Sequence, residues 1–203
     1  MARRNFKPGT LEAPLPAVMV SVGDMEKSNI ITIAWTGILS SDPPRTYISV
    51  RPSRYSHGII KEKGEFVINL TNEALSRATD FAGIYTGAKV DKFKKCNLTK
   101  AESKVVSAPT IAEAPISLEC RVFDVIESGT HDIFMADIVN VSCDENLLDE
   151  NGRICYEKAK LIAYSHGEYF SLGKKVGRFG YSTDKKKKGI GKAKRKPKPK
   201  EAK

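Results

Sequence analysis

The chain has 203 residues and a formal net charge of +10, from 34 Lys and Arg against 24 Asp and Glu. That length suffices for one domain with a sizeable core, alone or with an appendage. No run of about 18 apolar residues occurs, so the sequence predicts no membrane span. The basic residues 1–8 are not followed by an apolar segment, which argues against a secretory signal.

The excess positive charge is concentrated at the C-terminal end. Residues 185–203 hold eleven Lys and Arg and one acid, Glu201, which leaves residues 1–184 with 23 bases and 23 acids. Such a tail has nothing to bury and is expected to be disordered. It could bind nucleic acid weakly through counterion release, or simply aid solubility. We therefore predict a domain of residues 1–184 with no dedicated nucleic-acid partner, and a Lys-rich tail of residues 185–203.

The positions of the cysteines and histidines limit the kinds of site that the chain is expected to contain. The four cysteines are far apart and form no C-x-x-C pair, which favours reduced thiols and a cytoplasmic protein. The three histidines show no metal-ligand spacing, so no metal site is predicted.

The first half of the chain alternates strand patterns with helix patterns. We predict strands over residues 17–22, 29–35, 46–50 and 65–70 and helices over residues 57–64 and 73–85, with a helical turn near Lys92. The first two strands should pair antiparallel across the turn at Gly23. Ser53 or Ser56 is expected to cap the first helix, and Gly64 to end it.

The second half is more uniformly β. Residues 116–125 and 132–141 alternate apolar and polar side chains and should pair across the turn at residues 128–130. Shorter strands are predicted at residues 161–164 and 169–173. Many short strands with two helices between them indicate a mainly β protein with α inserts, a closed antiparallel barrel.

Polar residues interrupt the apolar strand at residues 29–36, which also contains Trp35, the only tryptophan. Asn29, Thr32 and Thr36 occupy positions that a plain core strand would fill with Val or Leu. A buried polar group without a partner costs about 1–3 kcal/mol. The partner is either neighbouring protein, the simpler interpretation for this segment alone, or a polar ligand.

Two arginines and two serines, Arg51, Ser53, Arg54 and Ser56, stand where a strand ends and a helix begins. Backbone N–H groups at a helix N-terminus, with Arg and Ser beside them, can bind a phosphate dianion. The alternative is helix capping with solvated arginines.

His131 lies directly after a Gly-Thr turn. A single histidine in such a position is more often a structural residue than a catalytic one.

The order of these segments is more specific than any one of them. From Asn29 through the Arg51–Ser56 stretch, the 66–70 strand and the Thr86-to-Lys92 loop to His131, it resembles the flavin reductase-like, FMN-binding split-barrel family. Within that family it is similar to the flavoredoxin branch, over roughly residues 10 to 182. The resemblance implies an FMN-binding split β-barrel, a homodimer, and non-covalent FMN close to the subunit interface.

The resemblance also implies a role for each motif residue. Thr32, Ile33, Ala34 and Trp35 would line the flavin and ribityl chain, largely through backbone groups, and Asn29 would also belong to the cofactor site. Ser53, Arg54 and Ser56 would hold the 5′-phosphate, with Arg51 near it. Asn69 and Leu70 would bond the ring edge, while Thr86, Gly87 and Lys92 would close the pocket. His131 would lie near the flavin, on the substrate side or across the dimer.

The implied function is an FMN-dependent oxidoreductase. It would pass electrons from NAD(P)H or a redox protein to a flavin, ferric or protein acceptor. The residues do not distinguish a reductase from an electron carrier, and they indicate no general acid or base. Two alternatives stand beside it: a β-barrel module whose basic tail binds nucleic acid, and a relative that has lost flavin. The neutral body and few strand aromatics disfavour the first.

Overall fold

The computed structural model describes residues 2–183, so the prediction for the Lys-rich tail lies outside the described residues. One compact unit ends at Gly173, and a second begins at Lys174. In the described part of the second unit, the one regular element is a short 3-10 helix, η3 (Tyr181–Thr183).

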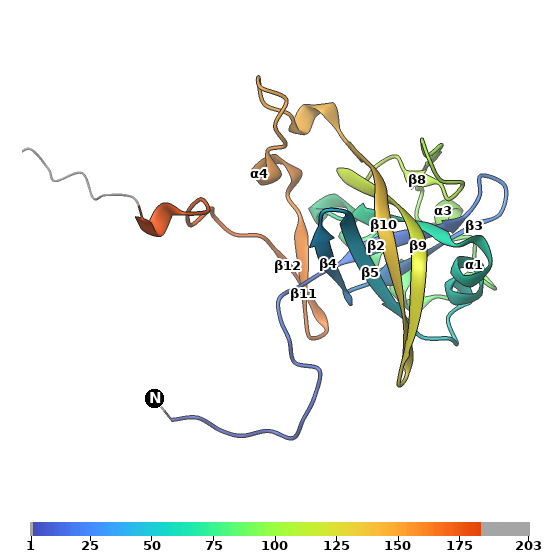
Figure 1. The fold of residues 1–203 in the computed structure, drawn as a ribbon, viewed down its shortest axis with the longest axis horizontal. Helices are drawn as coiled ribbons and strands as arrows, with labels where there is room; N and C mark the ends of the chain where they lie inside the picture. The colour runs from blue at the N-terminus through green and yellow to red at the C-terminus, as the bar shows by residue number, and fades with distance from the viewer. Residues whose placement is uncertain (1, 184–203) are drawn as a thin grey trace, which may run out of the picture. The chain divides into compact units, whose positions relative to one another are not determined.

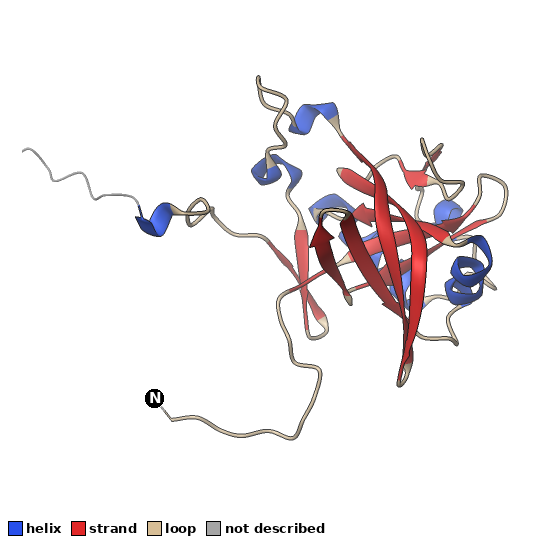
Figure 2. Ribbon diagram, in the orientation of Figure 1, coloured by secondary structure: helices blue, strands red, loops and turns tan. Residues whose placement is uncertain are grey.

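The main structural element is a seven-stranded antiparallel sheet (Figures 1 and 2). Its strands, in spatial order, are β3 (Ser28–Ile33), β2 (Val18–Gly23), β6 (Glu65–Leu70), β9 (Ile116–Ser128), β10 (His131–Cys143), β5 (Pro44–Val50) and β4 (Thr36–Ser41). The two outermost strands, β3 and β4, are neighbours in the sequence.

A two-residue connection, Ala34 and Trp35, joins these outermost strands and forces the sheet to close. Seven flat strands would place the two edges about 29 Å apart at the usual strand spacing. The three Cα steps from Ile33 to Thr36 span at most about 11 Å. The sheet must therefore curl into a barrel, and the Ser49 N–H donates to the Trp35 carbonyl at 2.9 Å, which extends the β4–β5 pairing into the connection.

Smaller elements surround this barrel. Two minor sheets are formed by β1 (Leu15–Pro16), β11 (Ile162–Ser165) and β12 (Glu168–Ser171), and by β7 (Lys100–Ala101) and β8 (Thr110–Ile111). The helical segments are α1 (Tyr55–Lys63), η1 (Glu73–Leu75), α2 (Ser76–Ile84), α3 (Lys92–Lys95), η2 (Glu145–Leu147) and α4 (Tyr156–Ala159). No helix within residues 2–183 is long and apolar enough to cross a membrane.

Both faces of β2 and β3 are covered, which explains why β2 is buried at every position. One face packs inside the barrel, where Val20 and Ile31 meet Phe66, Phe134 and other core residues. The other face packs beneath η1, α2 and α3, through a cluster that contains Met19, Ile30 and Leu75. Helices covering the outer face therefore hold the strand that carries the interrupting polar residues.

The mainly β barrel with helical inserts is confirmed, as are the antiparallel β2–β3 and β9–β10 pairs. Two sequence predictions were wrong. The predicted strand 29–35 ends at Ile33, and β4 was missed, because Ala34 and Trp35 carry the chain from one sheet edge to the other. Neither predicted serine caps α1: its N-cap is Arg54, with no side-chain cap, while Gly64 does end the helix in the left-handed conformation, with φ 68°.

Glu119, buried on β9, anchors the irregular loop that follows β7. Its carboxylate accepts backbone N–H groups of Lys104, Val105 and Val106 at 2.9, 2.6 and 3.2 Å, and the Asn140 amide at 2.7 Å. Burial by itself raises the pKa of this carboxyl, but the four donors outweigh burial and hold the pKa below its ordinary value.

Glu119→Gln should lower the free energy of unfolding by about 1–3 kcal/mol, since it removes charge-assisted acceptors from buried N–H groups. Because the folded-state pKa is depressed, this contribution is present above the unfolded pKa near about 4.3 and is lost as pH falls through the folded-state value. Urea unfolding from neutral to acid pH measures it. Glu102→Gln, at an exposed carboxylate in the same loop, is the control, and equal loss in both variants would contradict the assignment.

Candidate functional site

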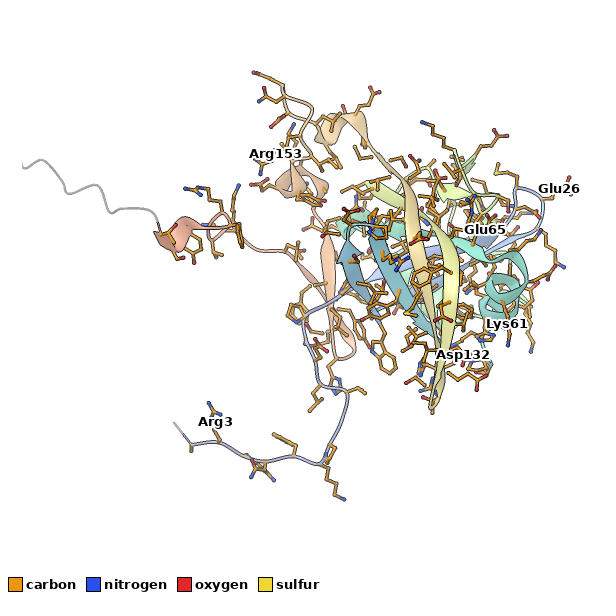
Figure 3. The ribbon with its side chains drawn as sticks, in the orientation of Figure 1. Arg3, Glu26, Lys61, Glu65, Asp132 and Arg153 are labelled. Carbon is orange, nitrogen blue, oxygen red and sulfur yellow. The ribbon has the colours of Figure 1, made fainter. Side chains whose placement is uncertain are left out.

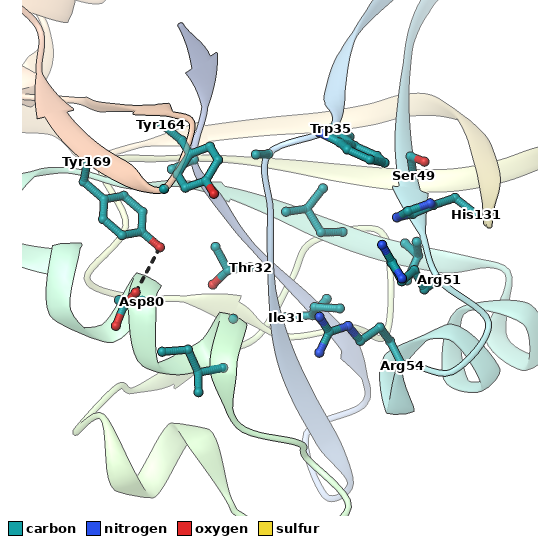
Figure 4. A pocket seen from close by; sticks show the side chains of 17 residues that line it. Ile31, Thr32, Trp35, Ser49, Arg51, Arg54, Asp80, His131, Tyr164 and Tyr169 are labelled. Atoms are coloured by element: carbon teal, nitrogen blue, oxygen red, sulfur yellow. Dashed lines mark hydrogen bonds between the residues drawn. The ribbon is translucent and has the colours of Figure 1, made fainter. Parts of the chain in front are cut away.

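Two adjoining pockets lie where the barrel seam meets α1 and α2. The larger has a volume of about 480 Å³ (Figure 4) and the smaller about 70 Å³. Both are lined by Ile31, Arg54 and Gly83, so they share a boundary. Ten to fifteen Å³ accommodates one water, so the smaller pocket has room for a group the size of a phosphate.

The smaller pocket is built around the N-terminus of α1. The backbone N–H groups of Tyr55 and Ser56 have no acceptor within the helix, and no side chain caps them. The Ser56 hydroxyl instead accepts the Asn29 side-chain amide at 2.7 Å, which fixes the helix start against β3. The positive end of the helix dipole and the Arg54 side chain therefore face one small volume.

A buried ammonium completes this pocket. Lys92, at the start of α3, donates its Nζ hydrogens to the carbonyls of Ile30 at 2.6 Å and Ala82 at 2.7 Å. Burial, and next the charge of Arg54, lowers the pKa of Lys92 to about 8. An anion in the pocket would offset that desolvation, so the arrangement suits a negatively charged group.

Gly87 closes the smaller pocket by a close backbone approach. A Cβ built at this position collides with the Asn29 side-chain amide, the same amide that donates to Ser56. The predicted Thr86-Gly87 loop therefore lies against the helix start because residue 87 has no side chain.

The end of β3 and the two residues after it form one side of the larger pocket, through Thr32, Ile33, Ala34 and Trp35. The Thr32 hydroxyl donates to the Thr79 carbonyl on α2. With Thr36 bonded to the Tyr47 carbonyl at 2.6 Å, and Asn29 to Ser56, all three interrupting residues find partners in the protein. The simpler of the two interpretations of this segment thus holds for their side chains.

One wall of the larger pocket is cationic and aromatic, from Trp35, Arg51, Arg54 and His131 (Figure 4). The Trp35 and His131 rings lie 4.5 Å apart between centroids, with planes inclined at 46°. Burial first, and then the charges of Arg51 and Arg54, lower the pKa of His131, so the imidazole is neutral at pH 7.

The opposite wall comes from the β11–β12 hairpin and α2, and its residues were not predicted. Tyr164 and Tyr169 pair across the hairpin, with ring centroids 5.6 Å apart, and the Tyr169 hydroxyl donates to Asp80 at 3.4 Å. Burial, followed by the Asp80 charge, raises the pKa of Tyr169 to about 12. If the predicted strands at residues 161–164 and 169–173 had been paired as a hairpin, the sequence would have placed the two tyrosines together. No sequence pattern identifies Asp80 as a site residue.

Most predicted site residues line the two pockets. Those at the larger pocket are Thr32, Ile33, Ala34, Trp35, Arg51, Arg54 and His131, and those at the smaller are Asn29, Ser53, Arg54, Ser56, Thr86, Gly87 and Lys92. Arg51 lines the larger pocket and not the smaller one, which differs from its expected place near the phosphate.

Asn69 and Leu70 line neither pocket, so the structure does not support the ring-edge role expected for them. Asn69 is fully buried, and its amide donates to the Met19 carbonyl and the Ser21 hydroxyl while its oxygen accepts from Ile111 and Ser117. Its bonding capacity is used within the protein. Leu70 packs against apolar core clusters.

A buried pair beneath the pockets ties α1 to the barrel. His57 Nε2 lies 2.7 Å from Asp132 Oδ2 (Asp132 is labelled in Figure 3), and the His57 ring packs edge-on against Phe134. This contact joins the helix of the smaller pocket to the strand that begins at His131.

The sequence is similar to known proteins over most of its length. Residues 11–173 match the family model described as flavin reductase like domain. An uncharacterized protein of Archaeoglobus fulgidus is 37% identical over 144 residues, covering 71% of this chain and 81% of its own.

Solved structures resemble the fold closely. The flavoredoxin of Desulfovibrio vulgaris (Miyazaki F) superposes with a TM-score of 0.84 and 30% identity over 90% of this chain and 100% of its own. An FMN-binding protein from Thermus thermophilus, with bound 1-cyclohex-2-enone, superposes with a TM-score of 0.74 and 25% identity, over 88% of this chain and 98% of its own.

Gly87→Ala should destabilise the protein by about 1–3 kcal/mol, because the added methyl displaces the Asn29 amide from Ser56. Gly58→Ala is the matched control: a Cβ there meets nothing within 4 Å, and a helical glycine replaced by alanine gains up to about 1 kcal/mol. Thermal unfolding of both variants provides the comparison. A Gly87→Ala protein as stable as the Gly58→Ala protein would refute the close approach.

Proposed function

This chain belongs to the flavin reductase-like domain family, and from that membership we propose that it is a flavoprotein oxidoreductase that binds FMN in the two adjoining pockets. One observation carries the proposal: a small cationic pocket at a helix N-terminus opens into a larger pocket walled by aromatic side chains. A flavin mononucleotide has the matching shape, with a phosphate at one end and a ring system at the other.

The smaller pocket suits the 5′-phosphate. Arg54 and Lys92 supply positive charge, the free N–H groups of α1 supply oriented donors, and Ser53 lines the same space. These are the donors that a phosphate dianion prefers. The match between donor set and ligand charge supports FMN over riboflavin, which lacks the phosphate.

The larger pocket suits the ribityl chain and ring system. Residues 32–35 would run along the flavin, with backbone groups available because the Thr32 hydroxyl is already bonded to α2. The Tyr164 and Tyr169 wall would exclude water from one side of the ring. When bound, FMN accepts a hydride or single electrons, and this chain's residues orient it and set the surrounding charge.

Two kinds of electron donor fit this proposal. The protein could be a reductase that oxidises NAD(P)H directly, or an electron carrier that accepts electrons from a redox protein. Similarity to a flavoredoxin supports the carrier, while the family itself supports the reductase. We propose a flavin, ferric or protein acceptor in either case. The neutral imidazole of His131 stands beside the flavin space and needs no proton-transfer role in this scheme.

We also propose a homodimer. Exposed apolar side chains lie on three barrel strands, with Ile38 on β4, Phe123 and Val125 on β9 and Val141 on β10. A second copy would cover this surface. Light scattering should give twice the chain mass of 22.4 kDa, whereas a mass of one chain at micromolar concentration would refute the dimer.

The purified protein, reconstituted with FMN, should show flavin absorption bands that persist through gel filtration. Arg54→Gln should weaken FMN binding about tenfold and leave riboflavin binding nearly unchanged, since the proposed partner of this guanidinium is the phosphate, which riboflavin lacks. Arg51→Gln, a change confined to the larger pocket, is the matched control and should retain FMN. Failure of the wild-type chain to bind FMN, or equal loss of both flavins in Arg54→Gln, would count against the proposal.

FMN affinity should also depend on pH through Lys92. Its pKa is about 8 in the free chain, and a bound phosphate favours the ammonium and raises it. Above about pH 8 the complex therefore binds more protons than the free chain, so affinity is full below pH 8 and falls as pH rises above it. Fluorescence titrations with FMN and riboflavin measure this. Riboflavin affinity, and FMN affinity in Lys92→Met, should not show the fall.

A further inference from the structure

We propose that Arg51 belongs to an oxyanion subsite for the second substrate, separate from the cofactor phosphate. The subsite would bind a planar molecule that carries a carboxylate or phosphate group, beside the rings of Trp35 and His131. This inference rests on the proposed function, because it assumes that FMN fills the smaller pocket and the adjoining part of the larger one.

The structure separates the two arginines, although they are three residues apart in the sequence. Arg54 lines both pockets and stands at the N-cap of α1, whereas Arg51 lines only the larger pocket. Arg51 directly follows β5, whose last residue, Val50, pairs with Asp132 on β10. The next position in that register places Arg51 opposite His131, away from the cationic smaller pocket.

Arg51 has an unused charge. Within residues 2–183 no side-chain hydrogen bond or ion pair involves its guanidinium, and the side chain is exposed at the pocket. Its interaction with His131 is unfavourable to a charged imidazole, since the positive charge of Arg51 contributes to the lowered pKa of His131. A guanidinium placed beside an imidazole, with no carboxylate partner, is suited to an anion that comes from outside the chain.

The opposite charges on the two walls of the pocket would orient an anionic ligand. Figure 4 shows Arg51, Arg54 and His131 on one side and Asp80 with the two tyrosines on the other. An anionic group would be repelled by Asp80 and attracted by Arg51, so its acidic end would lie at the Arg51 side. The tilted Trp35 and His131 rings beside Arg51 offer an aromatic surface for a planar body.

The test uses the full-length chain loaded with FMN, so that the smaller pocket is already occupied. Calorimetry and the flavin absorption spectrum follow titration with benzoate, with benzamide as its neutral isostere, and with inorganic phosphate. Benzoate should bind about tenfold more tightly than benzamide, the difference expected of one charge-assisted pair. Arg51→Gln should abolish that preference and Arg51→Lys should restore part of it, and both should retain FMN.

The outcomes separate the substrate classes and the two proposals. Arg51-dependent binding of benzoate alone assigns the subsite to a carboxylate, and Arg51-dependent binding of phosphate alone assigns it to a phosphorylated substrate. Equal affinity for benzoate and benzamide with no phosphate binding, or a preference that survives in Arg51→Gln, would overturn the subsite while leaving FMN binding intact. A wild-type chain that holds no FMN would instead overturn the proposed function.

Discussion

The rest of the structure depends on the two-residue connection between the outermost strands of the sheet. Ala34 and Trp35 are too few to bridge the edges of a flat seven-stranded sheet, so the barrel must close at this point. Closure brings β3 beside β5 and, with it, the start of β10. The larger pocket lies along this seam, which is why residues from six separate stretches of the chain line it.

Neutral hydrogen bonds hold the site together and leave its charges free. Asn29 fastens β3 to the start of α1, and Thr32 fastens it to α2, each by a contact between uncharged groups. Arg51 and Arg54 take part in no ion pair among the described residues, and Lys92 bonds only to carbonyls. Three cations on a body of balanced charge therefore remain available to anionic ligands.

The strand containing Asn29 and Thr32 shows how much about a binding site can be inferred from polar residues in an apolar strand. Asn29 and Thr32 line the smaller and the larger pocket, and their side chains are bonded to other parts of the protein. Asn69 shows the opposite case, because its position in a resembling motif suggested a ligand contact, while its hydrogen bonds link its own strand, β6, to β2, β8 and β9. Whether a buried amide serves the fold or a ligand depends on neighbours from distant stretches.

The sequence by itself determined six of the seven barrel strands, helices α1 and α2, the turns at Gly64 and Gly129, the neutral body and the two-arginine stretch, because these follow from local periodicity and residue type. It did not reveal β4, the wall formed by Tyr164, Tyr169 and Asp80, or the division of Arg51 and Arg54 between two pockets. Those features arise only when the barrel closes and residues more than 80 positions apart, such as Asp80 and Tyr169, come into contact. Barrel closure is a property of strand order, which local patterns do not encode.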